Sequence, residues 1–174
     1  MPTVSNTSPL IWLSKIGKIT LLKELFGEVI IPQEVYDEAI ERGLQGGFSD
    51  AFIINEAAEE GWIKTSKLAQ KEVAFCQKIV KHAFEIHLGE AQAIVLAQRL
   101  NALLLIDESA GRAFAEAWGL KVKGTVYVII SALRRGLVSR VEAKDMLLTL
   151  VSKGFRIEPN LLAKLIKEMD RFQP

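Results

Sequence analysis

Short apolar runs alternate with longer amphipathic segments along this chain of 174 residues. The clearest run is Leu103-Leu104-Leu105-Ile106, which follows Asn101-Ala102 and is closed by Asp107 and Glu108. Uninterrupted runs of this kind are typical of strands in a parallel sheet, because helices cover both faces of such a sheet. The pattern predicts a strand over 102–106 and four weaker ones over 3–5, 28–31, 62–64 and 121–123.

The segments between these runs carry helical periodicity and helix-ending glycines. The predicted helices span residues 8–13, 19–26, 50–60, 68–82, 90–100, 109–118, 126–134, 140–151 and 160–169, with a further one from Pro32 to near Gly43. Strands that alternate with helices predict an α/β fold with a parallel sheet between helical layers. Since no linker interrupts the chain, we expect one domain over 1–174, with the helices of 126–174 as a C-terminal extension.

Composition narrows the class of protein. Apolar residues make up 49% of the chain, which is enough to build a core without crosslinks. The single cysteine, Cys76, excludes an internal disulfide and a cysteine-rich zinc site. Neither a signal peptide nor an apolar run of membrane-spanning length is present in the sequence, so we expect a cytoplasmic protein without a membrane partner.

The net charge of +1 conceals an asymmetry between the two parts of the chain. Residues 1–120 carry 11 Lys and Arg against 16 Asp and Glu, whereas residues 121–174 carry 11 against 5. An acidic body joined to a basic C-terminal part suits a protein whose acids hold cations and whose basic part meets phosphate. Ordinary solvated helix surface explains the same pattern equally well.

Two predicted strands end in polar residues that can share a site. Asn6 follows the strand over 3–5, and Asp107 follows the strand over 102–106. Ligands of open α/β sheets bind outside the carboxyl ends of the strands, so these two side chains meet in one crevice if the strands are neighbours. Glu90 begins a helix on its inward stripe, and Glu38 lies at the edge of the apolar face of its own helix.

Each acid also has a local explanation. Asp107 suits the N-cap of the helix that follows it, and a glutamate at position 90 or 108 suits the first turn of a helix. Capping does not explain Glu38, so the three elements together favour a site. Carboxylates held close together repel each other unless a divalent cation compensates, and oxygen ligands of this kind suit Mg²⁺ or Mn²⁺.

Four motifs in order resemble the PIN-domain family. They are Val4-Ser5-Asn6-Thr7-Ser8-Pro9-Leu10-Ile11, Ile31-Pro32-Gln33-Glu34-Val35-Tyr36-Asp37-Glu38, His87-Leu88-Gly89-Glu90-Ala91-Gln92-Ala93-Ile94 and Leu104-Leu105-Ile106-Asp107-Glu108. The resemblance is to a prokaryotic subfamily of unassigned function related to the toxins of toxin–antitoxin pairs, and it covers residues 1–130 and the C-terminal helices. It implies a three-layer α/β/α fold and a Mg²⁺- or Mn²⁺-dependent endoribonuclease.

The resemblance also implies roles for single residues. Glu38, Glu90 and Asp107 match the family's acidic positions, and Glu108 is a further acid beside them. The family usually has aspartate where this chain has Asn6, which offers an amide oxygen to a metal but no charge. We therefore expect Asn6, Glu90, Asp107 and Glu108 as metal ligands, with a weakened affinity for the ion.

Three hypotheses follow for the function. The first is a metal-dependent ribonuclease, for which Lys121, Lys123, Arg134, Arg135 and Arg140 are the candidate phosphate contacts, although a solvated surface explains each of them equally well. The second is a non-catalytic PIN-like module that binds RNA or an antitoxin-like protein partner. The third is an α/β protein that pairs through its apolar C-terminal helices, and residues 126–151 carry enough apolar surface to predict a homodimer.

Overall fold

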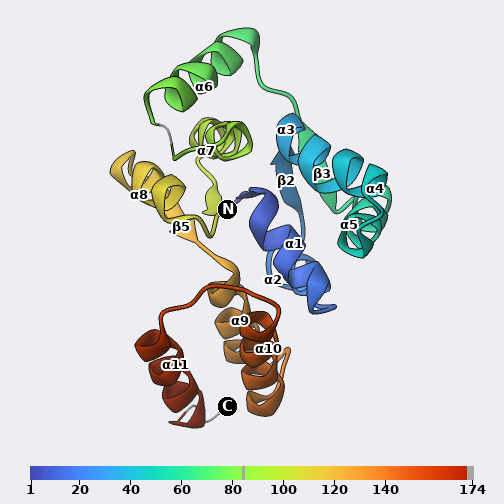
Figure 1. Ribbon diagram of the computed structural model, residues 1–174, viewed down its shortest axis with the longest axis vertical. Helices are drawn as coiled ribbons and strands as arrows, with labels where there is room; N and C mark the ends of the chain where they lie inside the picture. Colours follow the sequence, from blue (N-terminus) through green and yellow to red (C-terminus); the bar gives the residue numbers. More distant parts are fainter. Residues whose placement is uncertain (84, 172–174) are drawn as a thin grey trace. The chain divides into compact units, whose positions relative to one another are not determined.

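The computed structural model describes residues 1–83 and 85–171, and its N-terminal part is built around a five-stranded parallel sheet (Figure 1). Its strands are β1 (Thr3–Ser5), β2 (Val29–Pro32), β3 (Ile63–Ser66), β4 (Leu103–Leu105) and β5 (Lys121–Lys123). The strand order β3-β2-β1-β4-β5 confirms the α/β class with a parallel sheet, and each strand lies within two residues of its predicted bounds.

The order of the sheet reverses between β1 and β4. From β1 the chain winds outward through β2 and β3, and it then returns to the other side of β1 to add β4 and β5. Ser5 pairs with Leu105 across this junction, so the carboxyl ends of β1 and β4 lie side by side. This is the switch point at which open α/β sheets bind their ligands.

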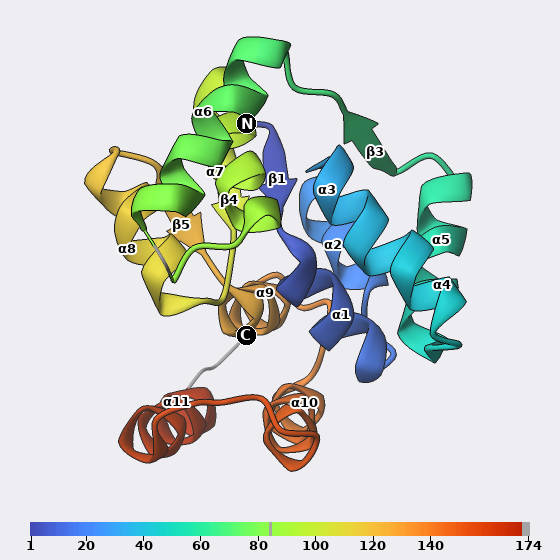
Figure 2. The same ribbon diagram turned by 45° about the horizontal axis from the view of Figure 1, so that its top comes forward.

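Helices of the first part of the chain surround the sheet (Figure 2). They are α1 (Thr7–Lys15), α2 (Thr20–Phe26), α5 (Ser49–Glu59), α6 (Gln70–His82), α7 (Leu88–Leu100) and α8 (Ser109–Ala117). The α7 helix packs against β1, β2 and β4, and α6 packs on α7. The fully buried Val4, Ile94 and Leu104 belong to the core between α7 and the sheet. All three residues of β4 are leucines, as expected for a strand covered on both faces, whereas Thr3 and Ser5 of β1 are polar and nevertheless buried.

The helix after β2 differs from the prediction. It runs as α3 (Gln33–Tyr36), the π-helical segment η1 (Asp37–Arg42) and α4 (Gly43–Gln45), so it ends two residues after Gly43 and contains a π-helical segment that the sequence pattern did not predict. Gly43 is instead a point of close packing, because a Cβ atom on it would lie 2.5 Å from the Cβ of Ala51 in α5. A π-turn inside an α-helix is uncommon and occurs often at functional sites. This one carries Glu38.

The chain divides into two compact units, Met1–Thr125 and Val126–Pro174. The second contains most of α9 (Thr125–Arg134), together with α10 (Arg140–Ser152) and α11 (Pro159–Arg171). The α10 helix packs on α11, and a capping box at its start joins Ser139 and Glu142 in two reciprocal hydrogen bonds. That residues 126–174 extend one domain stays a prediction. Among the described helices, none combines the length and the hydropathy needed to cross a membrane.

Candidate functional site

The carboxyl ends of β1 and β4 bring Asn6 and Asp107 to one edge of the sheet. The backbone N–H of Asn6 donates to the carbonyl of Leu105 over 3.0 Å, which continues the pairing of the two strands by one residue. The expectation that these strands are neighbours is confirmed. Polar residues that follow each strand therefore lie together at the switch point, although they are about one hundred residues apart in the chain.

Asn6 joins a helix start to an acid. Its side chain is almost fully buried, and its Oδ1 atom accepts from the backbone N–H of Ser8 over 3.2 Å, which caps α1. Its Nδ2 atom donates to Oε2 of Glu108 over 2.8 Å. The amide therefore satisfies one oxygen of a neighbouring carboxylate, which an aspartate at this position cannot do.

The carboxylate of Asp107 accepts hydrogen bonds from hydroxyl groups and a backbone N–H of other segments, not from the helix that follows it. Its Oδ1 atom accepts from the backbone N–H of Thr125 over 2.7 Å, and its Oδ2 atom accepts from the hydroxyls of Thr125 (2.7 Å) and Ser8 (3.3 Å). The expectation that Asp107 caps the following helix is wrong, since Glu108 is the N-cap residue of α8. Burial raises the pKa of Asp107, and these hydrogen bonds offset part of that shift.

A glycine makes the arrangement around Asp107 possible. A Cβ atom on Gly124 would lie 2.6 Å from Oδ1 of Asp107, so a larger residue there would displace the carboxylate. Arg112 lies on the same side, where its Nη1 atom donates to the carbonyl of Ile106 over 3.0 Å. The turn between β5 and α9 is thus shaped to the carboxylate of a different strand.

Glu90 has one carboxylate oxygen that nothing in the described residues satisfies. The residue is 5% exposed, and its Oε2 atom accepts from the backbone N–H of His87 over 2.8 Å, as a first-turn glutamate does. Its Oε1 atom is buried and has no hydrogen-bond partner among the described residues. Burial raises the pKa of Glu90, and the nearby carboxylates of Glu108 and Glu38 raise it further.

Glycines line this part of the site as well. A Cβ atom on Gly111 in α8 would lie 2.7 Å from Oε1 of Glu90, and one on Gly89 in α7 would lie 2.8 Å from Oε2 of Glu38. Three glycines on three elements therefore leave room for three carboxylates. Capping alone does not explain such close approaches, because a cap needs only the first turn of its own helix.

Glu38 reaches the site from the π-helical segment. Its Oε2 atom accepts from the hydroxyl of Thr7 over 2.6 Å, and its Oε1 atom lies 3.9 Å from Nη1 of Arg42. The side chain of Glu38 is 27% exposed, which makes it more accessible than Glu90. We call Glu38, Glu90, Asp107 and Glu108 the carboxylate cluster.

Sequence reasoning missed the hydroxyls that bind these acids. Thr7 and Ser8 directly follow Asn6, and Thr125 follows the fifth strand by two residues. The rule that placed Asn6 and Asp107 at the carboxyl ends of strands applies equally to Thr125, so this signal was available. Arg42 also had a local signal, because it follows Glu38 by four residues, the spacing at which charged side chains meet on a helix.

The donor set of the cluster fits a hard divalent cation. It consists of carboxylate oxygens, an amide oxygen and hydroxyls, which are the ligands that Mg²⁺ and Mn²⁺ prefer. The unsatisfied Oε1 atom of Glu90 and the mutual repulsion of Glu90, Glu38 and Glu108 are both relieved by a positive charge. Within the described residues, no group of three or more His, Cys, Asp or Glu side chains is arranged to hold a metal ion.

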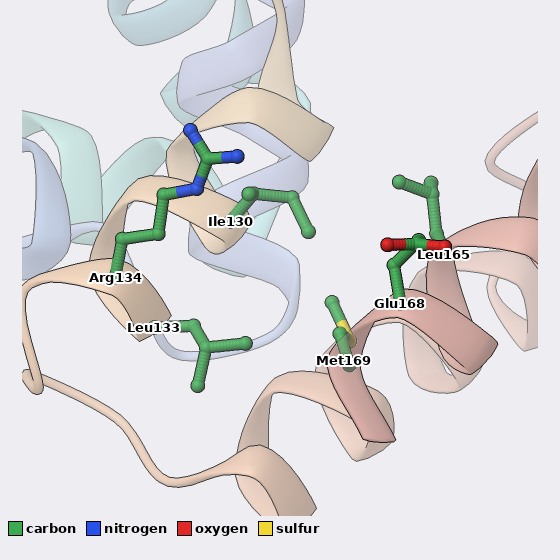
Figure 3. A pocket seen from close by; sticks show the side chains of 6 residues that line it. All are labelled: Ile130, Leu133, Arg134, Leu165, Glu168 and Met169. Carbon is green, nitrogen blue, oxygen red and sulfur yellow. The ribbon is translucent and has the colours of Figure 1, made fainter. Parts of the chain in front are cut away.

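The predicted phosphate contacts lie in both units. Lys121 and Lys123 are exposed on the edge strand β5, and Lys123 pairs in register with Leu105. Arg134 lines a cavity of about 240 Å³ between α9 and α11, together with Leu133, Glu168 and three further apolar residues (Figure 3). Arg140 donates to the carbonyl of Asp170, so that arginine links α10 to α11.

Comparisons with known proteins agree with the fold. A family model described as a PIN domain matches residues 2–171. A solved structure, a PilT N-terminus domain protein from the archaeon Sulfolobus solfataricus, is similar with a TM-score of 0.50 and 16% sequence identity over 76% of this chain and 94% of that one. At this level of identity the likeness shows the fold alone. A search of curated proteins finds no match.

Proposed function

The chain belongs to the PIN-domain family, and from that premise we propose that it is a divalent-metal-dependent endoribonuclease. PIN domains typically depend on a divalent metal. The observation that carries the proposal is the buried Oε1 atom of Glu90, which has no donor among the described residues and belongs to a carboxyl whose pKa is raised by burial and by the nearby carboxylates of Glu108 and Glu38. A buried carboxylate oxygen is costly unless a cation or a proton binds it.

We propose that several residues at this site would bind the cation together. Glu90 would hold it through its free oxygen, with Glu108 and Asp107 beside it and the amide oxygen of Asn6 as a neutral donor. A Mg²⁺ or Mn²⁺ ion held by these residues would supply an activated water molecule and positive charge for the phosphoryl oxygens. The donors from Thr125 and Ser8 keep Asp107 in one orientation, so the negative charge is positioned in advance.

Glu38 is suited to orient water at the open side of the cluster. One of its oxygens is held by Thr7, and the other is free of hydrogen bonds among the described residues because Arg42 stays 3.9 Å away. A carboxylate that is fixed at one oxygen and partly exposed at the other accepts a proton from a water molecule in a defined direction. We assign it this role in the hydrolysis of the phosphodiester.

RNA would reach the cluster along basic side chains. Lys121 and Lys123 are exposed on β5, whose carboxyl end leads to Thr125 beside Asp107. Arg134, Arg135 and Arg140 remain proposed contacts of the second unit. Lysine and arginine contacts of this kind bind the phosphate backbone without regard to sequence, so we expect no base specificity from them.

The test compares the wild-type protein with Glu90→Gln on a labelled single-stranded RNA in MnCl₂, in MgCl₂ and in EDTA. Wild type should cut internally in either metal and not in EDTA. The Glu90→Gln variant keeps the size and the His87 contact of the side chain but removes its charge, so we expect at least a 100-fold loss of activity. Wild-type protein that leaves the RNA intact in both metals would refute the proposal.

A second candidate function rests on Asn6. Its amide bonds Glu108 at 2.8 Å and so satisfies, without a metal, an oxygen that the ion would otherwise bind. That arrangement favours a PIN-like module which binds RNA or a protein partner without cutting. Such a module should bind the same RNA equally well in EDTA and in MnCl₂, and it should not cut the RNA. The nuclease, by contrast, should bind Mn²⁺ and cut the RNA.

A further inference from the structure

Arg42 lies at the rim of the carboxylate cluster in a fixed position. It ends the π-helical segment, where its Nη2 atom donates to Oε1 of Glu34 over 2.6 Å and its Nη1 atom lies 3.9 Å from Oε1 of Glu38. The side chain of Glu34 is only 17% exposed, so it anchors the guanidinium. The side chain of Arg42 is 59% exposed, which leaves its outer face open to a ligand.

Stability gives little reason for this arrangement. Ion pairs with an exposed partner typically contribute less than about 1 kcal/mol. A guanidinium has five N–H donors, and among the described contacts only the Nη2 group of Arg42 is hydrogen-bonded. Arg42 therefore has donors that are not hydrogen-bonded, and they lie beside Glu38, the residue to which we assign the orientation of water.

Arg112 shows the contrast on the Asp107 side of the cluster. Its side chain is 33% exposed, its Nη1 atom donates to the carbonyl of Ile106, and its Nη2 atom lies 3.7 Å from Glu116. That guanidinium is engaged with the backbone next to Asp107. Each of these two arginines makes one hydrogen bond and one longer ion-pair contact, but the side chain of Arg42 is 59% exposed against 33% for Arg112, so Arg42 is the more accessible of the two to a ligand.

A polyanion that approaches this cluster meets strong repulsion. Glu38, Glu90, Asp107 and Glu108 carry four negative charges at full ionisation, and a divalent ion compensates only two of them. The phosphate to be cut would gain from the ion, but the neighbouring phosphate of the strand would not. A pre-oriented guanidinium matches the two free oxygens of a phosphodiester and is less strongly hydrated than an ammonium group.

We propose that Arg42 binds the phosphate next to the one that is cut, and so selects strands that extend past the cluster on the Glu38 side. This inference rests on the proposed ribonuclease function. It makes Arg42 a substrate-binding residue whose contact is the same before and during the chemical step. Contacts of that kind act on KM and leave kcat nearly unchanged.

The experiment measures steady-state cleavage of a single-stranded RNA in MnCl₂ by wild type, Arg42→Ala and Arg42→Lys. We expect Arg42→Ala to raise KM about 10-fold or more, which is the size of effect of one charge-assisted hydrogen bond, with kcat within about twofold of wild type. Arg42→Lys keeps the charge but not the planar fork, so its KM should fall between the two. Circular dichroism confirms that each variant is folded, and the lysine variant keeps the test decisive if the alanine variant is not.

The salt dependence of KM gives an independent readout. One lost phosphate contact on a single strand lowers the slope of log KM against log salt by about 0.7. The matched control is Arg99→Ala, which removes an equal charge at the opposite end of α7 from Glu90, where Arg99 pairs with Glu72 over 3.0 Å. The control should leave both KM and the slope at the wild-type values.

The outcomes separate this inference from the function on which it rests. Wild type that cuts RNA, together with an Arg42→Ala variant of unchanged KM and slope, overturns the role of Arg42 alone. The same holds if Arg42→Ala loses kcat at constant KM, because Arg42 would then act through Glu38. Wild type that does not cut RNA refutes the proposed function itself, whatever the variants do.

Discussion

Replacement of Asn6 by aspartate should change two properties in opposite directions: it should destabilise the metal-free protein and strengthen the binding of Mn²⁺. The side-chain amide of Asn6 donates to Glu108 over 2.8 Å, and its oxygen caps α1 through Ser8. Aspartate caps a helix as well as asparagine does, so Asn6→Asp preserves the cap. It replaces the Nδ2 donor with a second negatively charged oxygen against Oε2 of Glu108. The substitution therefore changes one contact and one charge.

The magnitude follows from that contact. A hydrogen bond between an amide and a carboxylate contributes about 1.5–3 kcal/mol, and its loss is compounded by repulsion between two unit charges. At about 4 Å and an effective dielectric constant of about 20, that repulsion is about 4 kcal/mol, part of which the pair relieves by taking up a proton. We expect Asn6→Asp to lower the free energy of unfolding by about 3 kcal/mol in EDTA at pH 7.

Metal should reverse much of this loss. The added charge beside the ion raises the affinity for Mn²⁺ by roughly tenfold or more, equivalent to about 1.4 kcal/mol for each factor of ten. An ion that binds only the folded state stabilises it in proportion to the logarithm of its concentration over Kd. The difference in stability between Asn6→Asp and wild type should therefore narrow as MnCl₂ is added.

Urea unfolding in EDTA and in MnCl₂, with calorimetric titration of Mn²⁺, measures both effects. Asn6→Ala is the control, because it removes the amide and the helix cap without adding charge, so it should lose stability in EDTA but gain no affinity for Mn²⁺. If Asn6→Asp is as stable as wild type in EDTA, the contact with Glu108 does not have the energetic weight assigned to it. Equal Mn²⁺ affinity would refute the placement of position 6 beside the ion.

Three further predictions test other parts of the molecule. Burial raises the pKa values of Glu90 and Asp107 above their ordinary values of 4.5 and 3.8. At a pH between the ordinary and the raised pKa values, the folded state therefore binds protons that the unfolded chain has lost. In EDTA, the free energy of unfolding should fall as the pH rises from about 4 through the raised pKa values of the folded state. The Glu90→Gln variant lacks one of the two groups, so its free energy of unfolding should fall less. Urea unfolding between pH 4 and 8 tests this, and a wild-type curve without the fall contradicts it. The Gly89→Ala variant should have a lower kcat, because the added Cβ atom displaces the carboxylate of Glu38. Its melting temperature should stay near that of wild type, because alanine favours the helix. An unchanged kcat would show that the carboxylate of Glu38 can move without loss of activity. Finally, α10 exposes apolar side chains such as Leu148, which is 50% exposed, so we expect a homodimer by sedimentation that Leu148→Glu weakens; a wild-type monomer at micromolar concentration contradicts this.

Much of the site could be anticipated from local patterns. The apolar run Leu103–Ile106 predicts a strand that is buried on both faces, so the position of Asp107 at the carboxyl end of that strand follows from the local pattern. The same reasoning places Asn6 after β1 and brings Glu90 to the inward stripe of α7, where the structure buries it. Periodicity and strand ends are properties of neighbouring residues, which is why the chain order reveals them without any knowledge of packing.

The partners of these side chains are decided by the tertiary structure. The local pattern predicts that Asp107 caps the helix that follows it. In the structure, the donors to its carboxylate come from Thr125, 18 residues later, and from Ser8, 99 residues earlier. The direction of Glu38 depends on a π-turn, and the continuation of that helix depends on contact between Gly43 and Ala51. A side chain binds the donors that the packing of distant elements brings within hydrogen-bond distance. Sequence thus determined which residues stand at the edge of the sheet, and only the fold decided what each of them binds, because hydrogen bonds depend on distances that no local pattern records.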